Sequence, residues 1–95
     1  MHYVYVLYSL KDHKLYKGST SDISKRLLRH NRGGNKSTAH RRPFILVHVE
    51  ISADRSSALS RESYLKTLEG GSKLKAFLQS QHILDADGRL ALAAS

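Results

Sequence analysis

Runs of apolar residues alternate with short polar segments along the chain, and their spacing predicts three strands and three helices. Residues 3–9 and 44–51 are nearly continuous runs of β-branched, aromatic and aliphatic residues, which is typical of buried strands. Residues 14–18 follow the first run after a polar turn and are predicted to form the returning strand of a hairpin. Apolar periodicity and capping residues predict helices over residues 22–31, 54–68 and 73–81.

The order strand, strand, helix, strand, helix, helix predicts a single α/β (α+β) domain. The hairpin and the third strand would form a small three-stranded sheet, mixed or antiparallel, with helices on its faces. Gly70 and Gly71 are predicted to end the second helix, and Ser72 to cap the third. We expect the domain to span residues 1–82, and residues 83–95 to form a loosely packed C-terminal tail.

The chain is strongly basic. Its 95 residues include 16 Lys and Arg against 8 Asp and Glu, which gives a formal net charge of +8. This balance favours a polyanionic partner, above all nucleic acid; a basic protein that binds no polyanion is the alternative. The absence of cysteine excludes disulfides, thiolate catalysis and cysteine-based zinc sites. With no apolar run of roughly 18 residues and no signal-peptide pattern, we expect a cytoplasmic, nucleoid-associated protein that does not bind membranes.

Glu62 is the residue that suggests chemistry most directly. It shares one face of its predicted helix with Ala58 and Leu65, at spacings i, i+4 and i+7. A carboxylate among apolar neighbours is costly to bury unless a cation or a hydrogen-bond donor meets it. In a basic protein this suggests a metal ion working beside a phosphate. The alternative is a structural ion pair with Arg61, Lys66 or another cation.

The hairpin and the first helix add side chains suited to phosphodiester hydrolysis. Tyr5 and Tyr16 lie on paired strands, and Arg26 and His30 lie one turn apart on the helix. A guanidinium can neutralise charge that grows on phosphate oxygens, and a phenol or imidazole can take a proton from water. Taken singly, the tyrosines could also be core aromatics, Arg26 a solvated side chain and His30 a residue favoured by the helix dipole.

Four features of the chain occur in a fixed order: the triplet Tyr3-Val4-Tyr5, the triplet Tyr16-Lys17-Gly18, Arg26 on the next helix and Glu62 on a later one. In this order and spacing the chain resembles the GIY-YIG nuclease family, and in particular its small stand-alone bacterial (UPF0213-like) members. The resemblance covers about residues 2 to 80. It implies the GIY-YIG nuclease fold.

The resemblance also implies a metal-dependent endonuclease that hydrolyses phosphodiester bonds in DNA, with selectivity for DNA structure and a role in DNA repair or processing. Glu62 would be the only protein ligand of one Mg²⁺ or Mn²⁺. Arg26 would stabilise the transition state. Tyr16 would act as the general base or orient the attacking water, and Tyr5 would help to place the scissile phosphate or that water. His30 would share the proton-handling role.

Eight basic residues are expected to contact nucleic acid, and a partner protein could supply targeting. Lys17 stands where the family usually has a branched apolar residue. Lys66, one turn past Glu62, could replace a polar residue that some family nucleases carry after the glutamate helix. The full set is Lys17, Arg29, Arg32, Lys36, His40, Arg41, Arg42 and Lys66.

Two other functions remain open. One is a catalytically weak or inactive nucleic-acid-binding module with the same fold, and the other is a structural or protein-interaction domain. Intact Tyr5, Tyr16, Arg26 and Glu62 favour the enzyme, because a pure binding module has no need of an inward carboxylate among phosphates. A protein-interaction domain would lose DNA binding at moderate salt and would bind no divalent ion.

Overall fold

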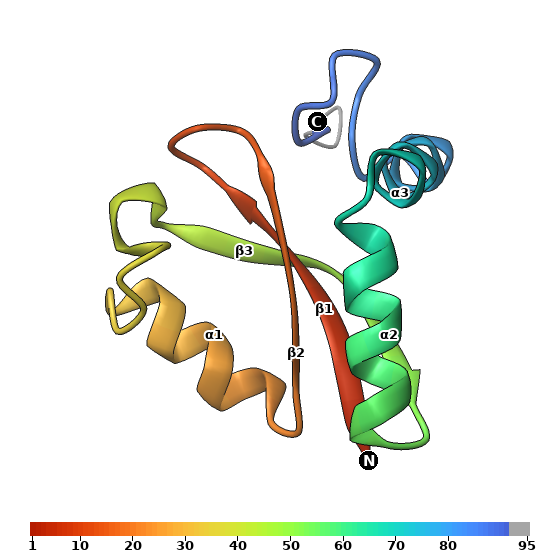
Figure 1. Ribbon diagram of the computed structural model, residues 1–95. Coiled ribbons are helices and arrows are strands. Elements are labelled where there is room, and N and C mark those ends of the chain that lie inside the picture. Colours follow the sequence, from red (N-terminus) through yellow and green to blue (C-terminus); the bar gives the residue numbers. More distant parts are fainter. Residues whose placement is uncertain (92–95) are drawn as a thin grey trace.

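The computed structural model describes residues 1–91, which form a three-stranded antiparallel sheet with three α-helices (Figure 1). The strands are β1 (His2–Ser9), β2 (Leu15–Thr20) and β3 (Phe44–Ser52), in the spatial order β2-β1-β3. The helices are α1 (Ile23–Asn31), α2 (Arg55–Leu65) and α3 (Leu68–Ser80), with a short 3₁₀ turn η1 (Ala39–Arg41) before β3. The predicted fold class and element order are confirmed, and both strand pairs are antiparallel.

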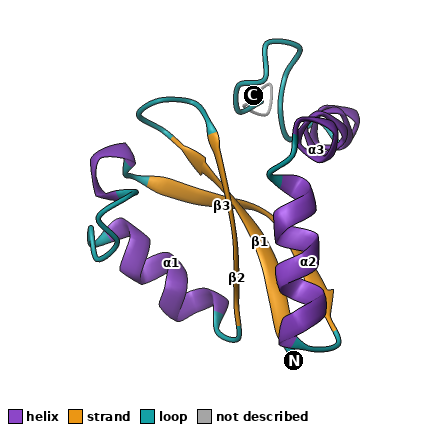
Figure 2. Ribbon diagram, in the orientation of Figure 1, coloured by secondary structure: helices purple, strands orange, loops and turns teal. Residues whose placement is uncertain are grey.

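The two faces of the sheet carry separate apolar cores, because side chains along a strand alternate between faces. Val4, Val6 and Tyr8 are buried in one core with residues of α2 and α3. Tyr5 and Leu7 are buried on the other face, which α1 covers. Figure 2 shows the helices on either side of the sheet. Since β2 is an edge strand, side chains from α1 and from α2 can meet beyond its free edge.

The boundary between the last two helices differs from the prediction. α2 ends at Leu65 and α3 begins at Leu68, so both glycines lie inside α3 and the predicted break at the glycines is wrong. Thr67 caps α3 by accepting a hydrogen bond from the backbone N–H of Gly70. A Cβ at Gly70 would collide with the carbonyl oxygen of Tyr64. The glycine therefore permits close packing of α3 against the end of α2.

Part of the segment predicted to be a loose tail is packed on the core. Leu84 is buried among the residues that lie under α2 and α3, and it forms an isolated β-bridge with Leu90. The backbone N–H of Ala91 donates a hydrogen bond to the carbonyl oxygen of Ile83. Residues 92–95, the rest of that tail, lie outside the described residues. Within residues 1–91, none of the helices has the length and apolar character needed to cross a bilayer.

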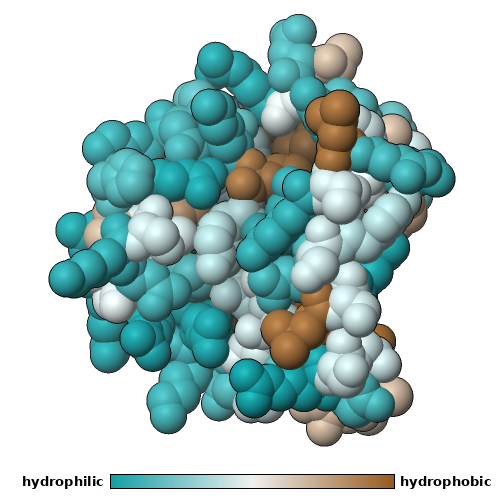
Figure 3. Space-filling model, in the orientation of Figure 1, coloured by the Kyte–Doolittle hydropathy of each residue, from teal (hydrophilic) through white to brown (hydrophobic). Residues whose placement is uncertain are grey.

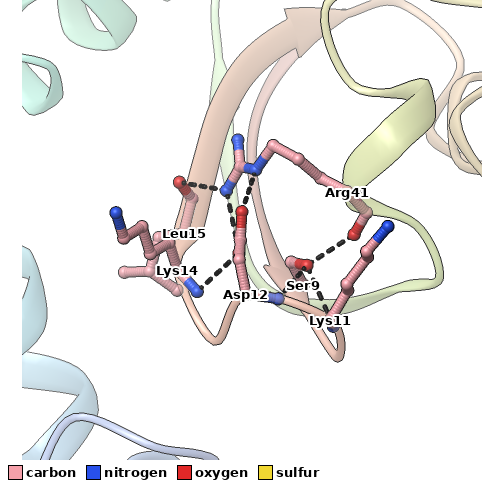
Figure 4. A network of polar contacts seen from close by, with 6 residues as sticks. All are labelled: Ser9, Lys11, Asp12, Lys14, Leu15 and Arg41. Atoms are coloured by element: carbon pink, nitrogen blue, oxygen red, sulfur yellow. Dashed lines mark hydrogen bonds and ion pairs between the residues drawn. The ribbon is translucent and has the colours of Figure 1, made fainter.

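A polar network ties the β1–β2 turn to the segment before β3 (Figure 4). Nε of Arg41 donates to Oδ2 of Asp12 at 2.6 Å, and a second guanidinium nitrogen donates to the carbonyl oxygen of Leu15 at 3.4 Å. The buried Ser9 hydroxyl donates to the carbonyl oxygen of Arg41. The hydrogen bond from Arg41 is the main reason why the pKa of Asp12 falls from 3.8 to about 2. Arg41 therefore holds the hairpin in place.

We expect Asp12→Asn to lower the free energy of unfolding at pH 7 by about 1 kcal/mol, because Arg41 loses its charged partner. The pKa of Asp12 is lowered to about 2 on folding, so this contribution is present above about pH 4 and is lost as the pH falls through about 2. Thermal unfolding should separate variant and wild type at pH 7 and bring them together near pH 2. The control, Glu69→Gln, removes an exposed carboxylate and should change little at either pH. A difference that did not depend on pH would contradict the assignment.

Candidate active site

Four of the five residues predicted to be catalytic come together in a pocket at the outer edge of β2. Tyr5, Tyr16, Arg26 and Glu62 line this pocket, one each from β1, β2, α1 and α2. The pocket has a volume of about 390 Å³. The remaining lining residues are His2, Gly18, Ser19, Thr20, Ser21, Arg55 and Leu59. Figure 3 shows that the face of the molecule on which β2 lies is largely hydrophilic, with small separate apolar patches.

Gly18 gives the Tyr5 side chain the room that it needs at the pocket. The two residues are directly opposite each other in the β1–β2 ladder. A Cβ at position 18 would lie 2.5 Å from the hydroxyl oxygen of Tyr5, so any other residue would displace the phenol. The glycine of the second triplet is therefore explained by the close approach of this ring.

A buried chain of hydrogen bonds holds Tyr5. Its hydroxyl oxygen lies 3.0 Å from Nε2 of His30, and Nδ1 of His30 lies 2.9 Å from the hydroxyl oxygen of Thr38. The Thr38 hydroxyl is placed to donate to the carbonyl oxygen of Asn35, at 3.5 Å. If the Thr38 hydroxyl donates to Asn35, it must accept from His30. Nδ1 of His30 then donates to Thr38, and the Tyr5 hydroxyl donates to Nε2 of His30.

Burial fixes the protonation states of this chain. It is the main cause that raises the pKa of Tyr5 to about 12, against a smaller opposing effect of Arg26. Burial also lowers the pKa of His30, and the neighbouring Arg26 and Arg29 act in the same direction. At neutral pH the pair is therefore a phenol and a neutral imidazole. His30 is fully buried and does not line the pocket, so it can reach a substrate only through Tyr5.

Tyr16 has a fixed ring and an accessible hydroxyl. The ring packs edge-on against His30, with 4.9 Å between centroids, and lies 6.3 Å from the ring of Tyr5. Within residues 1–91, the structure shows no protein hydrogen bond to the Tyr16 hydroxyl, whereas the Tyr5 hydroxyl is bound to His30. Of the two tyrosines, Tyr16 is therefore the one whose hydroxyl is free to bind a water molecule or a phosphate oxygen in the pocket.

The Glu62 carboxylate lies at the pocket, with 18% of its side chain exposed. Its Oε2 accepts a hydrogen bond of 2.7 Å from Nζ of Lys66, one turn further along α2. Arg61 is not a partner, because it binds Glu50 instead. The ion pair considered as an alternative for Glu62 therefore exists, and its cation is Lys66.

The side chains of the pocket suit a hard divalent cation that keeps most of its water. Within residues 1–91 no three His, Asp or Glu side chains gather as a metal cluster, and Glu62 supplies the single carboxylate of the pocket. Proteins commonly bind Mg²⁺ through one or two carboxylates, with waters and substrate phosphates completing its shell. A structural zinc site does not fit, because it needs four protein ligands.

The basic residues predicted to contact nucleic acid do not form one surface. Arg29 lies beside this pocket, where it lines a second polar hollow with Arg26. Arg41 is held by Asp12, and the guanidinium of Arg42 covers Gly33. The exposed members on the loop between α1 and η1, or in η1 itself, are Arg32, Lys36 and His40. Arg41 is thus better explained by its structural contacts than by binding of nucleic acid.

Lys17 and Lys66 are separated from the other predicted contact residues. Lys17 alternates with Tyr16 along β2, so its side chain lies on the opposite face of the sheet, towards α2 and α3. There it lines a hollow together with Lys66 and Gly71. The sequence placed Lys17 in the motif but could not show that it faces away from the two tyrosines.

Several residues of the site were not predicted. Thr38 orients His30 from a loop, and no local pattern marks it. His2 and Arg55 line the pocket, and Arg55 precedes Glu62 by seven residues, a spacing that places both on one face of α2. Helical periodicity could therefore have identified Arg55, whereas Thr38 required the tertiary structure.

The fold and the pocket define a class of small α+β catalytic domain in which a tyrosine hairpin, an arginine helix and a glutamate helix meet at one edge strand. The family model described as the GIY-YIG catalytic domain matches residues 1–75, and the chain belongs to this family. The resemblance drawn from the two triplets, Arg26 and Glu62 is therefore confirmed.

Relatives from bacteria and archaea support the same assignment. The chain is 45% identical to a UPF0213 protein of Staphylococcus saprophyticus over 75 residues, which cover 78% of this chain and 90% of the relative. It is 46% identical to a UPF0213 protein of Haloquadratum walsbyi over 67 residues, 70% of this chain and 74% of the relative. The solution NMR structure of a UPF0213 protein from Bacillus halodurans aligns with a TM-score of 0.50 at 33% identity, covering 80% of this chain and 83% of that one.

Proposed function

We propose that this protein is a divalent-metal-dependent endonuclease that hydrolyses phosphodiester bonds in DNA. The observation that carries the proposal is the meeting of Tyr5, Tyr16, Arg26 and Glu62, from four separate elements, in one polar pocket. The net charge of +8 supports a polyanionic substrate. The family match adds to this, because it is to a catalytic domain.

Each residue of the pocket would have a distinct role. Glu62 would hold a Mg²⁺ or Mn²⁺ ion, which supplies charge to polarise the scissile phosphate. Arg26 would bind the oxygens on which negative charge grows in the transition state. Tyr16 would orient the attacking water, because its hydroxyl makes no protein hydrogen bond within residues 1–91, and in its phenolate form it would accept the proton of that water. Tyr5 would position the phosphate, and His30 would fix the Tyr5 hydroxyl and accept its proton when needed.

The site favours recognition of nucleic-acid shape over base sequence. The pocket is polar and lies at the edge of a 95-residue domain, so contacts to the sugar–phosphate backbone would outnumber contacts to bases. We therefore propose structure-selective cleavage, in DNA repair or processing, with steep dependence of affinity on salt. A partner protein could supply further targeting.

A binding module without catalytic activity is the second candidate. The observation in its favour is the hydrogen bond between Lys66 and Glu62, because the ammonium group sits where a cation would bind the carboxylate. In this alternative the Glu62–Lys66 pair is structural, and the basic side chains alone hold the nucleic acid.

Cleavage assays on labelled DNA distinguish the two candidates. Single-stranded, duplex, flap and branched DNAs are incubated with the protein in Mg²⁺, in Mn²⁺ and in EDTA. We expect cleavage of at least one of these structures with either ion, and none in EDTA, because the scissile phosphate needs the cation. Binding of the same DNAs without cleavage under any of these conditions would support the binding module instead.

A further inference from the structure

A further hollow, which we call the lysine hollow, lies on the other side of the β2 edge from the catalytic pocket. It is the place where β2 meets the junction of α2 and α3. Lys17 from β2, Lys66 from the end of α2 and Lys75 from α3 line it, together with Gly71. Its volume is about 350 Å³. Tyr16 and Lys17 are adjacent in β2, so the catalytic pocket and this hollow lie on the two sides of one strand.

The hollow gathers three lysines, of which only Lys66 is paired with a carboxylate in the part of the chain that the structure describes. Within residues 1–91, neither Lys17 nor Lys75 makes an ion pair, and Lys66 reaches only Glu62. The acidic residue nearest in α3, Glu69, is exposed and pairs with Lys73. Burial lowers the pKa of Lys17, and the nearby charge of Lys66 adds to that effect. Lys66 and Lys75 are exposed and Lys17 is partly buried, so an anion bound among the three ammonium groups would offset the repulsion between Lys17 and Lys66.

Gly71 keeps the hollow open. Glycine inside a helix is less stable than alanine by roughly 0.5–1 kcal/mol, so its presence needs a reason. At Gly70 the reason is contact with Tyr64, but a Cβ at Gly71 would meet no backbone atom closer than 3.4 Å, the carbonyl oxygen of Leu65. It would instead lie 3.8 Å from Nζ of Lys17. An added methyl group would therefore occupy space beside the ammonium group without straining the helix.

We propose that Lys17, Lys66 and Lys75 form a binding subsite for a backbone phosphate of a nucleic-acid strand, next to the phosphate that is cut. This inference rests on the proposed function. Lys66 connects the two sites, because its ammonium group contacts Glu62 in the catalytic pocket and lines the lysine hollow. A strand bound at Glu62 would then continue past Lys66 to Lys17 and Lys75, across the β2 edge and away from the loop after α1.

Oligonucleotide binding in EDTA tests the subsite without depending on cleavage. Affinity for a labelled single-stranded DNA is measured over a range of salt concentrations for Lys17→Met, Lys75→Met and Gly71→Ala. Each lysine variant should bind about fivefold more weakly at 0.1 M salt and should reduce the slope of log K against log salt by about 0.7. Gly71→Ala should also bind more weakly while its melting temperature stays equal or rises. Lys73→Met, which removes one charge from the same helix, is the matched control and should bind like wild type.

The pattern across variants decides the outcome. If all three variants bind like Lys73→Met while the wild type still cuts DNA, the subsite is wrong and the proposed nuclease stands. If the wild type binds DNA and the variants weaken as expected but nothing is cut in Mg²⁺, the subsite stands and the nuclease fails. Titration of the Gly71 amide resonance with inorganic phosphate identifies the anion. If inorganic phosphate saturated the shift of this resonance at the same concentration as the oligonucleotide does, the hollow would be a site for free anions and the nucleic-acid assignment would be wrong.

Discussion

Glu62→Gln should reduce metal-dependent DNA cleavage on the order of 10³-fold or more, since Glu62 supplies the single carboxylate among the described residues that line the pocket. The amide keeps the size of the side chain and can still accept a hydrogen bond from Lys66, so the fold should be retained. Affinity for DNA in EDTA should stay the same or increase, because a negative charge beside the phosphates is removed. Initial rates at saturating DNA in Mg²⁺ and Mn²⁺ measure the effect, and binding of Mn²⁺ followed by electron paramagnetic resonance should weaken in parallel.

The matched control for this variant is Glu69→Gln. Glu69 lies on α3 with an exposed side chain, so removing its charge should leave cleavage unchanged. Equal melting temperatures for both variants and the wild type would show that lost activity is not lost folding. If Glu62→Gln cut DNA within about threefold of the wild-type rate, Glu62 would not be the metal ligand.

Arg26→Ala should lower the cleavage rate at saturating DNA by about 10²-fold or more, because one charged donor to the transition state is lost. Arg26→Lys should fall between the alanine variant and the wild type, since an ammonium group keeps the charge but cannot form two parallel hydrogen bonds. Arg26 also lies near Tyr5 and His30, where its charge favours the phenolate and the neutral imidazole. The pH dependence of the rate should therefore shift in the alanine variant as well.

Lys25→Ala provides the comparison for Arg26. Lys25 is the preceding residue of α1 and is exposed, so its loss changes the net charge equally without altering the candidate pocket. A smaller effect on the rate than on the apparent affinity is expected for Lys25→Ala. Unchanged kinetics of Arg26→Ala would remove Arg26 from the site.

The sequence predicted the strands and the first helix well because their signals are local. The apolar run in β1 and the capping Asp22 of α1 each act within a few residues. The α2–α3 boundary was predicted wrongly because glycine has two uses that look alike in sequence. Gly70 and Gly71 resemble a helix end, yet Gly70 serves close packing, and the true cap is Thr67.

The candidate site could be predicted only as a set of residues. The order and spacing of Tyr5, Tyr16, Arg26 and Glu62 identified them as candidate site residues. The structure brings all four to one pocket. The surroundings depend on contacts that are distant in sequence. The complete burial of His30 is one such feature, and the engagement of Arg41 by Asp12 is another. Charge alone suggested that Arg41 binds a phosphate. The sequence does not show whether a basic residue in a loop is exposed to solvent or paired with a carboxylate of the protein, as Arg41 is with Asp12.

The position of β1 in the sheet has a consequence for how the protein is made. Of the three strands, β1 is synthesised before the other two but lies in the centre, so its second neighbour, β3, is absent until some forty further residues have left the ribosome. Glu62 is made later still, and Leu84, which is buried in the core beneath α2, follows after it. The growing chain therefore passes the ribosome, a particle built largely of RNA, before its four pocket residues can meet. Under the proposed function, a nuclease with this chain order would become active only after α2 has been synthesised and has left the ribosome, because Glu62 is the last of the four residues along the chain.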